Sequence, residues 1–342
     1  MKFFRESSSF GLSRLLLASG IMLIALIVSA CGGDSRSGSA DVVYSAEVEG
    51  NIDVFKLGEE FENAVRLTSA TGDDFAPAWS PNKETIAFLS DRNGTPALWV
   101  MDAAGDSKRQ VSAAGVEVAT FRWSPDSTRI GIEIVSGGVH RVEVLDTETE
   151  ASTALSSAGD DARVGDWSPD GEWLVYSINA GENGGIMRRN PTGVDEIVLV
   201  TGRASNPRWS RNGQWIAFNR VLDDGSVNLA VMNKDGDSET IVATGVSASA
   251  PHDWAPDSKH IVYVSEVSGN DEIYVVKPDG KDTEQLTSNR VTDAAPIWSS
   301  SGELILFLSE GDGSYDVYSM ANNGEQQVRK TSIPDLIITA DW

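Results

Sequence analysis

Seven tryptophans divide the sequence at nearly constant intervals. Successive members lie 44, 44, 42, 45, 44 and 44 residues apart, at Trp79, Trp123, Trp167, Trp209, Trp254, Trp298 and Trp342. One four-stranded blade of a β-propeller takes about 40 to 45 residues. A chain of 342 residues could hold two ordinary domains, but this period predicts one ring of repeats instead.

Six of the seven tryptophans are followed by four residues that favour a chain reversal. Proline presets φ, and Asp, Asn and Gly tolerate the backbone conformations of tight turns. The tetrads are Ser80-Pro81-Asn82-Lys83, Ser124-Pro125-Asp126-Ser127, Ser168-Pro169-Asp170-Gly171, Ser210-Arg211-Asn212-Gly213, Ala255-Pro256-Asp257-Ser258 and Ser299-Ser300-Ser301-Gly302. Each tryptophan is therefore expected to end a strand.

Further β-rich runs follow each turn. Their aliphatic and aromatic residues suit strands that are covered on both faces. Second strands are expected at 86–90, 130–134, 174–178, 216–220, 261–265 and 304–309, and third strands at 97–102, 141–146, 185–190, 229–234, 272–277 and 316–321. Shorter fourth strands are expected after polar loops, for example at 109–112, 197–201 and 284–288. Each unit thus reads as a four-stranded antiparallel meander.

The segment before Trp79 has only three such runs, at residues 42–46, 52–57 and 64–69. The first strand that it lacks is supplied by residues 337–342, which end at the seventh tryptophan. Pairing between these two segments would hide the open edges of the sheet. The sequence therefore predicts an all-β fold, a seven-bladed propeller whose ring is closed by one composite blade.

The N-terminal segment has the order of a secretory signal. Lys2, Arg5 and Arg14 precede an apolar run over residues 15–28, which is too short for a comfortable membrane span. The run ends in Val28-Ser29-Ala30-Cys31, which resembles the lipobox of bacterial lipoproteins. A single cysteine can also be a small buried hydrophobe, but this one has no disulfide partner. We expect a signal peptide over 1–30 and lipidation of Cys31.

Residues 31–40 comprise that cysteine and a Gly/Ser-rich linker, and the propeller is expected over 41–342. Removing residues 1–30 takes away three basic and one acidic residue, which leaves 24 Lys+Arg, 50 Asp+Glu and a net charge of −26. Such a surface repels phosphate backbones, so nucleic acid is not an expected partner. The charge fits solubility outside the cytoplasm; attraction of cations or a basic partner is the alternative.

The repeat resembles the WD40-like repeat of the TolB propeller family. Its closest unit reads Pro77-Ala78-Trp79-Ser80-Pro81, then Ile86-Ala87-Phe88, then Leu98-Trp99-Val100-Met101-Asp102. The resemblance covers about residues 41–342. TolB itself has an α/β domain before six blades, is periplasmic and works with the peptidoglycan-associated lipoprotein. This chain has seven expected blades and a lipid anchor, so the resemblance implies the fold rather than a role in the Tol system.

Motifs for catalysis are sparse. The sequence has no Gly-x-Ser-x-Gly, His-Glu-x-x-His, P-loop or Cys-x-x-Cys motif. The tryptophans could form a sugar-binding platform, but one per repeat indicates packing between blades. Turn aspartates could be acids or ligands, and backbone hydrogen bonding is the simpler role; these are Asp126, Asp170 and Asp257. Among His140, His252 and His260, His252 is singled out because it precedes Asp253-Trp254 near a channel mouth.

The residue before the repeat tryptophan alternates in charge over four successive blades. These residues are Arg122, Asp166, Arg208 and Asp253, with Asp341 at the last position. We expect a partial ring of ion pairs at the channel mouth, with His252 beside it. The ring could bind a ligand or simply hold the blades in register. Acidic loops at Asp160-Asp161, Asp223-Asp224 and Asp271-Glu272 could hold a structural calcium ion, but they lack a fixed ligand spacing, so solvated turns are the simpler explanation. No other metal or cofactor is expected.

Together these features predict a monomeric binding or scaffolding propeller without catalysis. It would be lipid-anchored in the bacterial cell envelope, face the periplasm or the exterior, and hold a protein or an envelope glycan on its loops. The alternative is a carbohydrate lyase or hydrolase with a pocket at the channel mouth. It predicts a cluster of His252, Asp253 and other acids around a metal or water.

Overall fold

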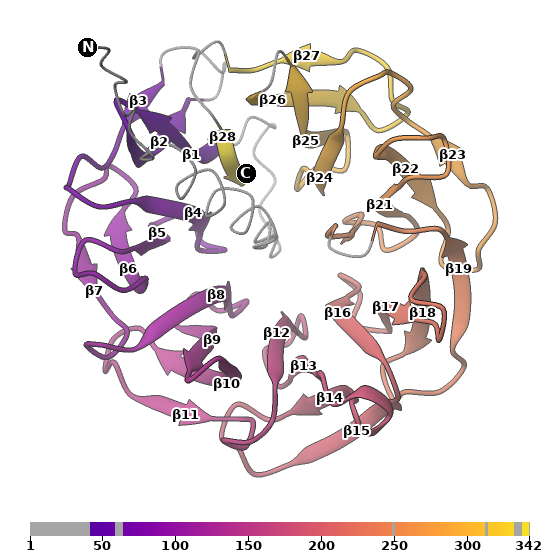
Figure 1. Cartoon of the computed structure of the whole chain (residues 1–342), viewed down its shortest axis with the longest axis horizontal. Coiled ribbons are helices and arrows are strands. Elements are labelled where there is room, and N and C mark those ends of the chain that lie inside the picture. The colour runs from indigo at the N-terminus through magenta and orange to yellow at the C-terminus, as the bar shows by residue number, and fades with distance from the viewer. Residues whose placement is uncertain (1–41, 59–63, 248–249, 312–313, 332–336, 342) are drawn as a thin grey trace, which may run out of the picture.

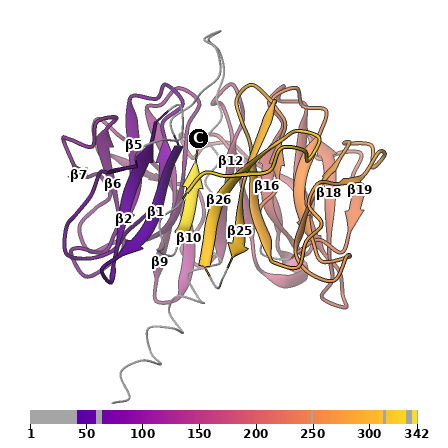
Figure 2. The same ribbon diagram turned by 90° about the horizontal axis from the view of Figure 1, so that it is seen from above.

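The molecule is a closed ring of seven four-stranded blades around a central axis (Figure 1). The structure, a computed structural model, describes residues 42–58, 64–247, 250–311, 314–331 and 337–341. Seen from the side, the strands run between two faces of a disc (Figure 2). We call the face with the loops after the repeat tryptophans the turn face, and the opposite one the entry face. The predicted all-β, seven-bladed propeller is confirmed.

In blades 2 to 7 the strands run outward from the axis in chain order, and in blade 1 the last strand of the chain is the innermost. Blade 1 consists of β28 (Ile337–Asp341), β1 (Val42–Val48), β2 (Asn51–Leu57) and β3 (Val65–Arg66). Blade 2 consists of β4 (Asp74–Trp79), β5 (Thr85–Ser90), β6 (Ala97–Asp102) and β7 (Arg109–Gln110). Blade 3 consists of β8 (Glu117–Trp123), β9 (Arg129–Ser136), β10 (Val139–Asp146) and β11 (Ser152–Ala154).

Blades 4 to 7 complete the ring. Blade 4 consists of β12 (Ala162–Trp167), β13 (Leu174–Ile178), β14 (Gly185–Arg189) and β15 (Glu196–Thr201), with a 3₁₀ turn at Gly181–Asn183. Blade 5 consists of β16 (Ala204–Trp209), β17 (Trp215–Val221), β18 (Val227–Asn233) and β19 (Thr240–Thr244). Blade 6 consists of β20 (Asp253–Trp254), β21 (Ile261–Ser265), β22 (Glu272–Val276) and β23 (Glu284–Gln285). Blade 7 consists of β24 (Asp293–Trp298), β25 (Leu304–Gly311), β26 (Ser314–Ala321) and β27 (Val328–Arg329).

The two ends of the described chain meet in blade 1, as predicted. Strand β28 pairs antiparallel with β1, with Val43 opposite Asp341 and Tyr44 opposite Ala340. The apolar side chains of this blade pack onto blade 7, where Leu306 and Val317 belong to the same core cluster as Tyr44. The composite blade thus seals the ring by backbone pairing on one side and by apolar packing on the other.

The apolar core is divided among the blade interfaces. Seven buried clusters lie in the described part of the chain, and each combines side chains from two neighbouring blades. At the boundary of blades 3 and 4, for example, Val142 and Val144 pack with Trp167 and Tyr176. No blade could bury both of its faces alone, so stability depends on the neighbours.

Several fourth strands are shorter than predicted. Strand β7 ends at Gln110 rather than residue 112, and β23 ends at Gln285 rather than residue 288. In both blades a side-chain hydroxyl replaces a backbone carbonyl as the acceptor for the third strand. Ser112 Oγ accepts from the N–H of Leu98 at 3.0 Å, and Thr287 Oγ1 accepts from the N–H of Ile273 at 2.9 Å. Ser and Thr side chains compete with the backbone in this way.

The innermost strands carry β-bulges just before the repeat tryptophan. In β4, β16 and β24 the pairing register shifts at Ala76, Asn206 and Ala295, whose φ angles are 50°, 52° and 56°. A proline follows each of them. Proline has no N–H to donate and is tolerated in a sheet at bulges. This explains why a Pro-x-Trp sequence can end an otherwise regular inner strand.

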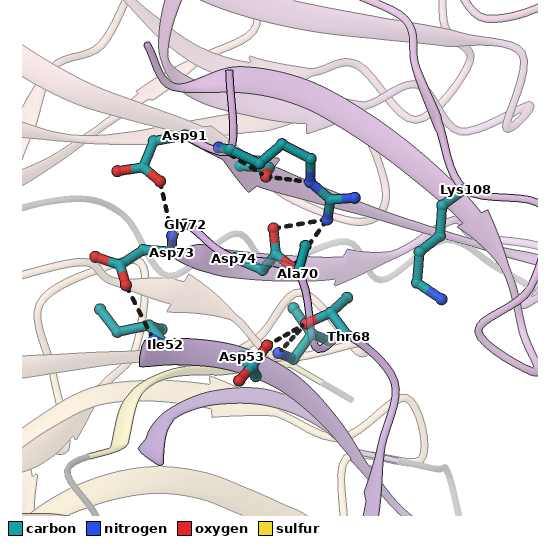
Figure 3. A network of polar contacts seen from close by, with 12 residues as sticks. Ile52, Asp53, Thr68, Ala70, Gly72, Asp73, Asp74, Asp91 and Lys108 are labelled. Carbon is teal, nitrogen blue, oxygen red and sulfur yellow. Dashed lines mark hydrogen bonds and ion pairs between the residues drawn. The ribbon is translucent and has the colours of Figure 1, made fainter. Parts of the chain in front are cut away.

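Polar contacts join blades 1 and 2 on the entry face (Figure 3). The N–H of Ile52 donates to Asp73 Oδ1 at 3.0 Å, and the N–H of Asp73 donates to Asp91 Oδ1 at 2.7 Å. Burial raises the pKa of Asp91, and so do the charges of Asp73 and Asp74, while hydrogen bonds from backbone N–H groups lower it. Asp74 itself accepts two hydrogen bonds from Arg92, at 2.8 and 2.9 Å. The Asp73 carboxylate thus joins the two blades, and those of Asp74 and Asp91 are held within blade 2.

Candidate functional site

The repeat tryptophans lie buried at the turn-face ends of the inner strands, between neighbouring blades. Trp167 Nε1 donates to the carbonyl of Arg122 at 3.1 Å, and Trp254 Nε1 donates to the carbonyl of Arg208 at 3.1 Å. Trp123 reaches the carbonyl of Ala78 in the same way at 3.3 Å. The buried Nε1 atoms of Trp209 and Trp298 have no such partner within the described ranges. Trp342 lies outside the described residues.

The aspartates that precede these tryptophans return the contact. Asp166 Oδ2 accepts from the N–H of Trp209 at 3.1 Å, and Asp253 Oδ2 accepts from the N–H of Trp298 at 2.9 Å. At the seam of the ring, Asp341 Oδ2 accepts from the N–H of Trp79 at 3.0 Å. Each aspartate thus caps the inner strand of the following blade.

The two arginines of the alternating series are buried among these carboxylates. Arg208 Nη1 donates to the carbonyl of Gly165 at 3.3 Å. Burial lowers the pKa of Arg208, and the charges of Asp166 and Asp253 oppose that shift. Burial also holds the pKa of Arg122 well below its usual value, helped by the charge of Arg208 and opposed by Asp166.

The structure therefore brings the alternating charges of four blades into one electrostatic neighbourhood on the channel wall. The carboxylates of this series also bind tryptophan N–H groups, which a simple ring of ion pairs does not include. Asp253 also lies 3.3 Å from Nη2 of Arg211, a residue that the sequence reasoning did not select. The sequence does contain a signal for this residue, because Arg211 stands where four of the other turns after a repeat tryptophan have proline. Burial raises the pKa of Asp253, while Arg211, the N–H of Trp298 and Arg208 lower it.

His252 lies beside this belt but is buried, with 1% of its surface exposed. Its Nδ1 is 3.5 Å from Nδ2 of Asn206. Burial and the charge of Arg208 lower the pKa of His252 to about 3, and the carbonyl of Ala217 opposes them only in part. The ring is therefore uncharged at neutral pH, and its basicity is far below that of a general base tuned to pH 7.

The other two histidines lie elsewhere. His140 Nδ1 is 2.6 Å from Oε1 of the buried Glu133 in blade 3, and His260 Nδ1 is 3.8 Å from Asp257 Oδ2 in blade 6. Burial raises the pKa of Glu133, whereas Arg163 and His140 lower it. The three histidines are thus not gathered in one place.

The turn aspartates serve their own loops. Asp126 Oδ1 accepts from Ser124 Oγ at 2.6 Å, and Asp170 Oδ1 accepts from Ser168 Oγ at 2.5 Å. Asp257 Oδ1 accepts from the N–H of Lys259 at 2.9 Å and also borders the groove described below. Burial raises the pKa of Asp126, but the hydrogen bonds from Ser124 and Thr128 outweigh it and lower that pKa to about 2.

Loops proposed for calcium also bind their own neighbours. Asp161 pairs with Arg163 at 2.6 Å, Asp224 accepts from Ser226 Oγ at 2.6 Å, and Asp271 accepts from Ser247 Oγ. Within the described ranges, no group of three or more His, Cys, Asp or Glu side chains is arranged to hold a metal ion. A structural calcium ion stays a prediction.

No helix among the described residues is long and apolar enough to cross a membrane.

An open groove lies on the turn face between blades 6 and 7. It has a volume of about 420 Å³, and its walls include Asp257, Val275, Asp282, Glu284, Trp298 and Asn322. Lys277 also borders it and pairs with Asp282 at 2.5 Å. The sequence reasoning missed this site, because its residues come from different strands and turns of two blades and follow no motif.

The comparisons with known proteins agree with this architecture. The family model described as the TolB beta propeller domain matches residues 35–205 and 193–342. The "Protein TolB homolog" of Chlorobaculum tepidum is 29% identical over 101 residues, which is 30% of this chain and 23% of that protein. The matched segments thus span less than a quarter of the length of the curated relatives, 23% and 14% in the first two.

Solved structures with little sequence identity share the fold. An oligogalacturonate lyase in complex with manganese superimposes with a TM-score of 0.68 at 16% identity, over 85% of this chain and 87% of the lyase. The propeller domain of the trilobed protease from Pyrococcus furiosus gives a TM-score of 0.66 at 14% identity, over 90% and 99% of the two chains. That propeller is described as having an open velcro topology, whereas here β28 and β1 close the ring.

Proposed function

This chain belongs to the TolB β-propeller domain family, and from that membership we propose that it is a non-catalytic binding propeller of the bacterial cell envelope, anchored through Cys31. Its partner would be a protein or another envelope component bound on the loop faces. The lipid anchor rests on the lipobox-like sequence before Cys31. The envelope location is consistent with the similarity to TolB homologues.

One observation carries the proposal against catalysis at the channel mouth. The residues that the sequence marks for chemistry, His252 and Asp253, are 1% and 5% exposed and pack between blades. Asp253 binds the N–H of Trp298, and the pKa of His252 is lowered to about 3. A substrate would have to displace the contacts that hold the blades together. The accessible polar surface lies instead on the turns, which suits recognition.

The anchor is tested by fractionation of cells that express either the native protein or Cys31→Ser. The native protein should sediment with membranes, and the variant should be released by osmotic shock with an unchanged Tm. Native protein in the soluble fraction would remove the anchor from the proposal.

The binding role is tested by crosslinking in the native envelope followed by mass spectrometry. The enzymatic alternative is tested by measuring the turnover of candidate polysaccharides. Purified protein incubated with polyuronates or peptidoglycan should release no new reducing ends or unsaturated sugars. Turnover that disappears in a folded His252→Gln variant would support the lyase or hydrolase instead. The crosslinked partner should be the same in native and His252→Gln cells.

A further inference from the structure

Cationic side chains bridge several blade boundaries on the turn face. Lys56 Nζ of blade 1 donates to the carbonyl of Ala103 in blade 2 at 2.9 Å. Arg188 Nη1 of blade 4 donates to the carbonyl of Lys234 in blade 5 at 2.5 Å. In both cases the carbonyl lies in the turn between the third and fourth strands of the following blade. A cation in this place joins two neighbouring blades through a hydrogen bond to that carbonyl.

A second cation position lies nearer the axis. Arg129 of blade 3 lies over the ring of Trp167 in blade 4, 5.1 Å from its centroid, and donates to the carbonyl of Gly171 at 3.3 Å. Guanidinium groups stack well on indole rings. The tryptophan that ends one inner strand thus receives a cation from the preceding blade.

Neither cation position carries a lysine or an arginine at the boundary of blades 6 and 7, and valine also occupies the third-strand position at Val100 and Val144. Val275 lies 21 residues after Trp254, as Arg188 lies 21 residues after Trp167. His260 lies six residues after Trp254, as Arg129 lies six residues after Trp123. Neither Val275 nor His260 has the reach of an arginine, and the groove of about 420 Å³ lies between these two residues and the next blade.

The rest of the groove matches the surroundings of the bridging cations. Asn322 corresponds to Lys234 and Ala103, because each donates its backbone N–H to the carbonyl just before its blade's second strand: Glu303, Gln214 and Glu84. Trp298 corresponds to Trp167 and lines the groove. Trp298 is only 4% exposed. Unlike that of Trp167, its indole N–H has no hydrogen-bond partner among the described residues.

The walls are acidic. Asp257, Asp282 and Glu284 face one lysine, Lys277, which is held by Asp282. The hydrogen bond and charge of Asp282 raise the pKa of Lys277, and Asp279 and Glu284 add to this effect. The groove therefore keeps a surplus of negative charge next to an aromatic ring, on a face exposed to solvent.

We infer that this groove binds the guanidinium group of an arginine that a partner protein inserts between blades 6 and 7, in the place that Arg129 and Arg188 occupy at other boundaries. This inference rests on the proposed binding function and specifies its contact. Arginine suits the site better than lysine because its planar group can stack on an indole and bind a carboxylate with two hydrogen bonds.

The probe is N-acetyl-arginine amide, titrated against the full folded propeller by NMR or calorimetry. Its neutral isostere, N-acetyl-citrulline amide, is the matched ligand. The arginine probe should shift signals of the groove residues and bind at least about tenfold more tightly than the citrulline probe. Equal binding of the two probes would overturn the inference.

Val275→Arg places a cation within the chain at the position that Arg188 occupies at its own boundary. This variant should lose binding of the arginine probe, and its melting curve must show that it stays folded, because Val275 belongs to the buried cluster of blades 6 and 7. The double variant Asp282→Asn/Glu284→Gln should weaken binding by roughly tenfold, because it removes the carboxylate partners. Asp279→Asn removes a nearby charge that does not line the groove, so it should bind as the native protein does.

Binding that persists in a folded Val275→Arg protein would refute the groove as the site. The same variant separates this inference from the proposed function. If native-envelope crosslinking still captures the partner with Val275→Arg, the propeller binds its partner elsewhere, and only the arginine contact is wrong.

Discussion

At the scale of single residues, two of the repeat tryptophans, Trp167 and Trp254, form a two-way contact between blades together with the aspartate before them. The indole N–H reaches back to the preceding blade, and an aspartate carboxylate reaches forward to the next tryptophan N–H. A buried amide or indole donor without a partner is costly. The repeated Trp therefore contributes both apolar area and a defined register between neighbouring sheets.

Replacing Trp254 by Phe should destabilise the protein more than replacing Trp209 by Phe. Both tryptophans are buried, at 1% and 4% exposure, but only Trp254 donates to a carbonyl. The two changes remove the same atoms, so their difference isolates the hydrogen bond, worth about 0.5 to 1.5 kcal/mol. Urea denaturation of the two variants measures it. A larger loss for Trp209→Phe would show that the indole hydrogen bond does not stabilise the interface.

The tryptophan positions follow from the sequence period, but the partners of the preceding charges do not. Neighbouring inner strands were expected to bring Arg122, Asp166, Arg208 and Asp253 near one another; each lies on the inner strand of its blade, and the ring of ion pairs stays a prediction. Which acceptor each group meets depends on how far adjacent sheets are rotated and on local close contacts. At Gly165, for instance, a Cβ would lie 2.5 Å from Pro207 Cγ and 2.6 Å from the carbonyl oxygen of Val175. Close contacts of this kind between neighbouring blades cannot be predicted from the spacing of a repeat.

At the scale of elements, β28 is the strand on which ring closure depends. Its pairing with β1 covers a backbone edge that would otherwise be open, and Ala340 packs in the cluster that joins blades 7 and 1. An exposed strand edge is also a template for association with other chains.

Removing residues 337–342 should lower the Tm by several degrees and promote aggregation. The variant loses the ladder with β1 and the hydrogen bond from Trp79 to Asp341. Asp341→Ala is the matched control, because it removes the carboxylate and keeps the strand, so its Tm should fall less. Calorimetry and light scattering measure the two effects. If the truncated protein has the same Tm as the native protein, the stability of the ring does not depend on this blade.

Strand number and order could be predicted because apolar runs and turn residues repeat in every blade. Strand ends could not be predicted as well. The fourth strands shorten where Ser112 or Thr287 replaces a backbone acceptor, and β20 is reduced to Asp253–Trp254. The groove at blade 6 was missed for a related reason: it is lined by side chains from strands and turns of two blades, and a repeat is recognised by what its units share.

At the scale of the whole molecule, the charge is strongly one-sided. The sequence carries 51 acidic and 27 basic residues, a net charge of −24. Repulsion among surface carboxylates opposes the compact state. Buried pairs such as Asp74 with Arg92 are screened much less by salt than exposed charges are.

Moderate salt should therefore raise the Tm. Between about 10 mM and 0.15 M ionic strength the Debye length falls from about 30 Å to about 8 Å, which screens repulsion across the surface. Calorimetry with a chloride salt tests this, with the same buffer at low salt as reference. A Tm that falls instead would mean that exposed ion pairs outweigh the general repulsion.

The composite blade also sets the order of events during biosynthesis. A ribosome makes β28 after every other described strand, so no earlier portion of the nascent chain can complete blade 1. Until then β1 lacks its inner neighbour, and the growing polypeptide exposes a strand edge that chaperones would have to protect. Blade 1 is consequently expected to form last among the blades, once β28 has been synthesised.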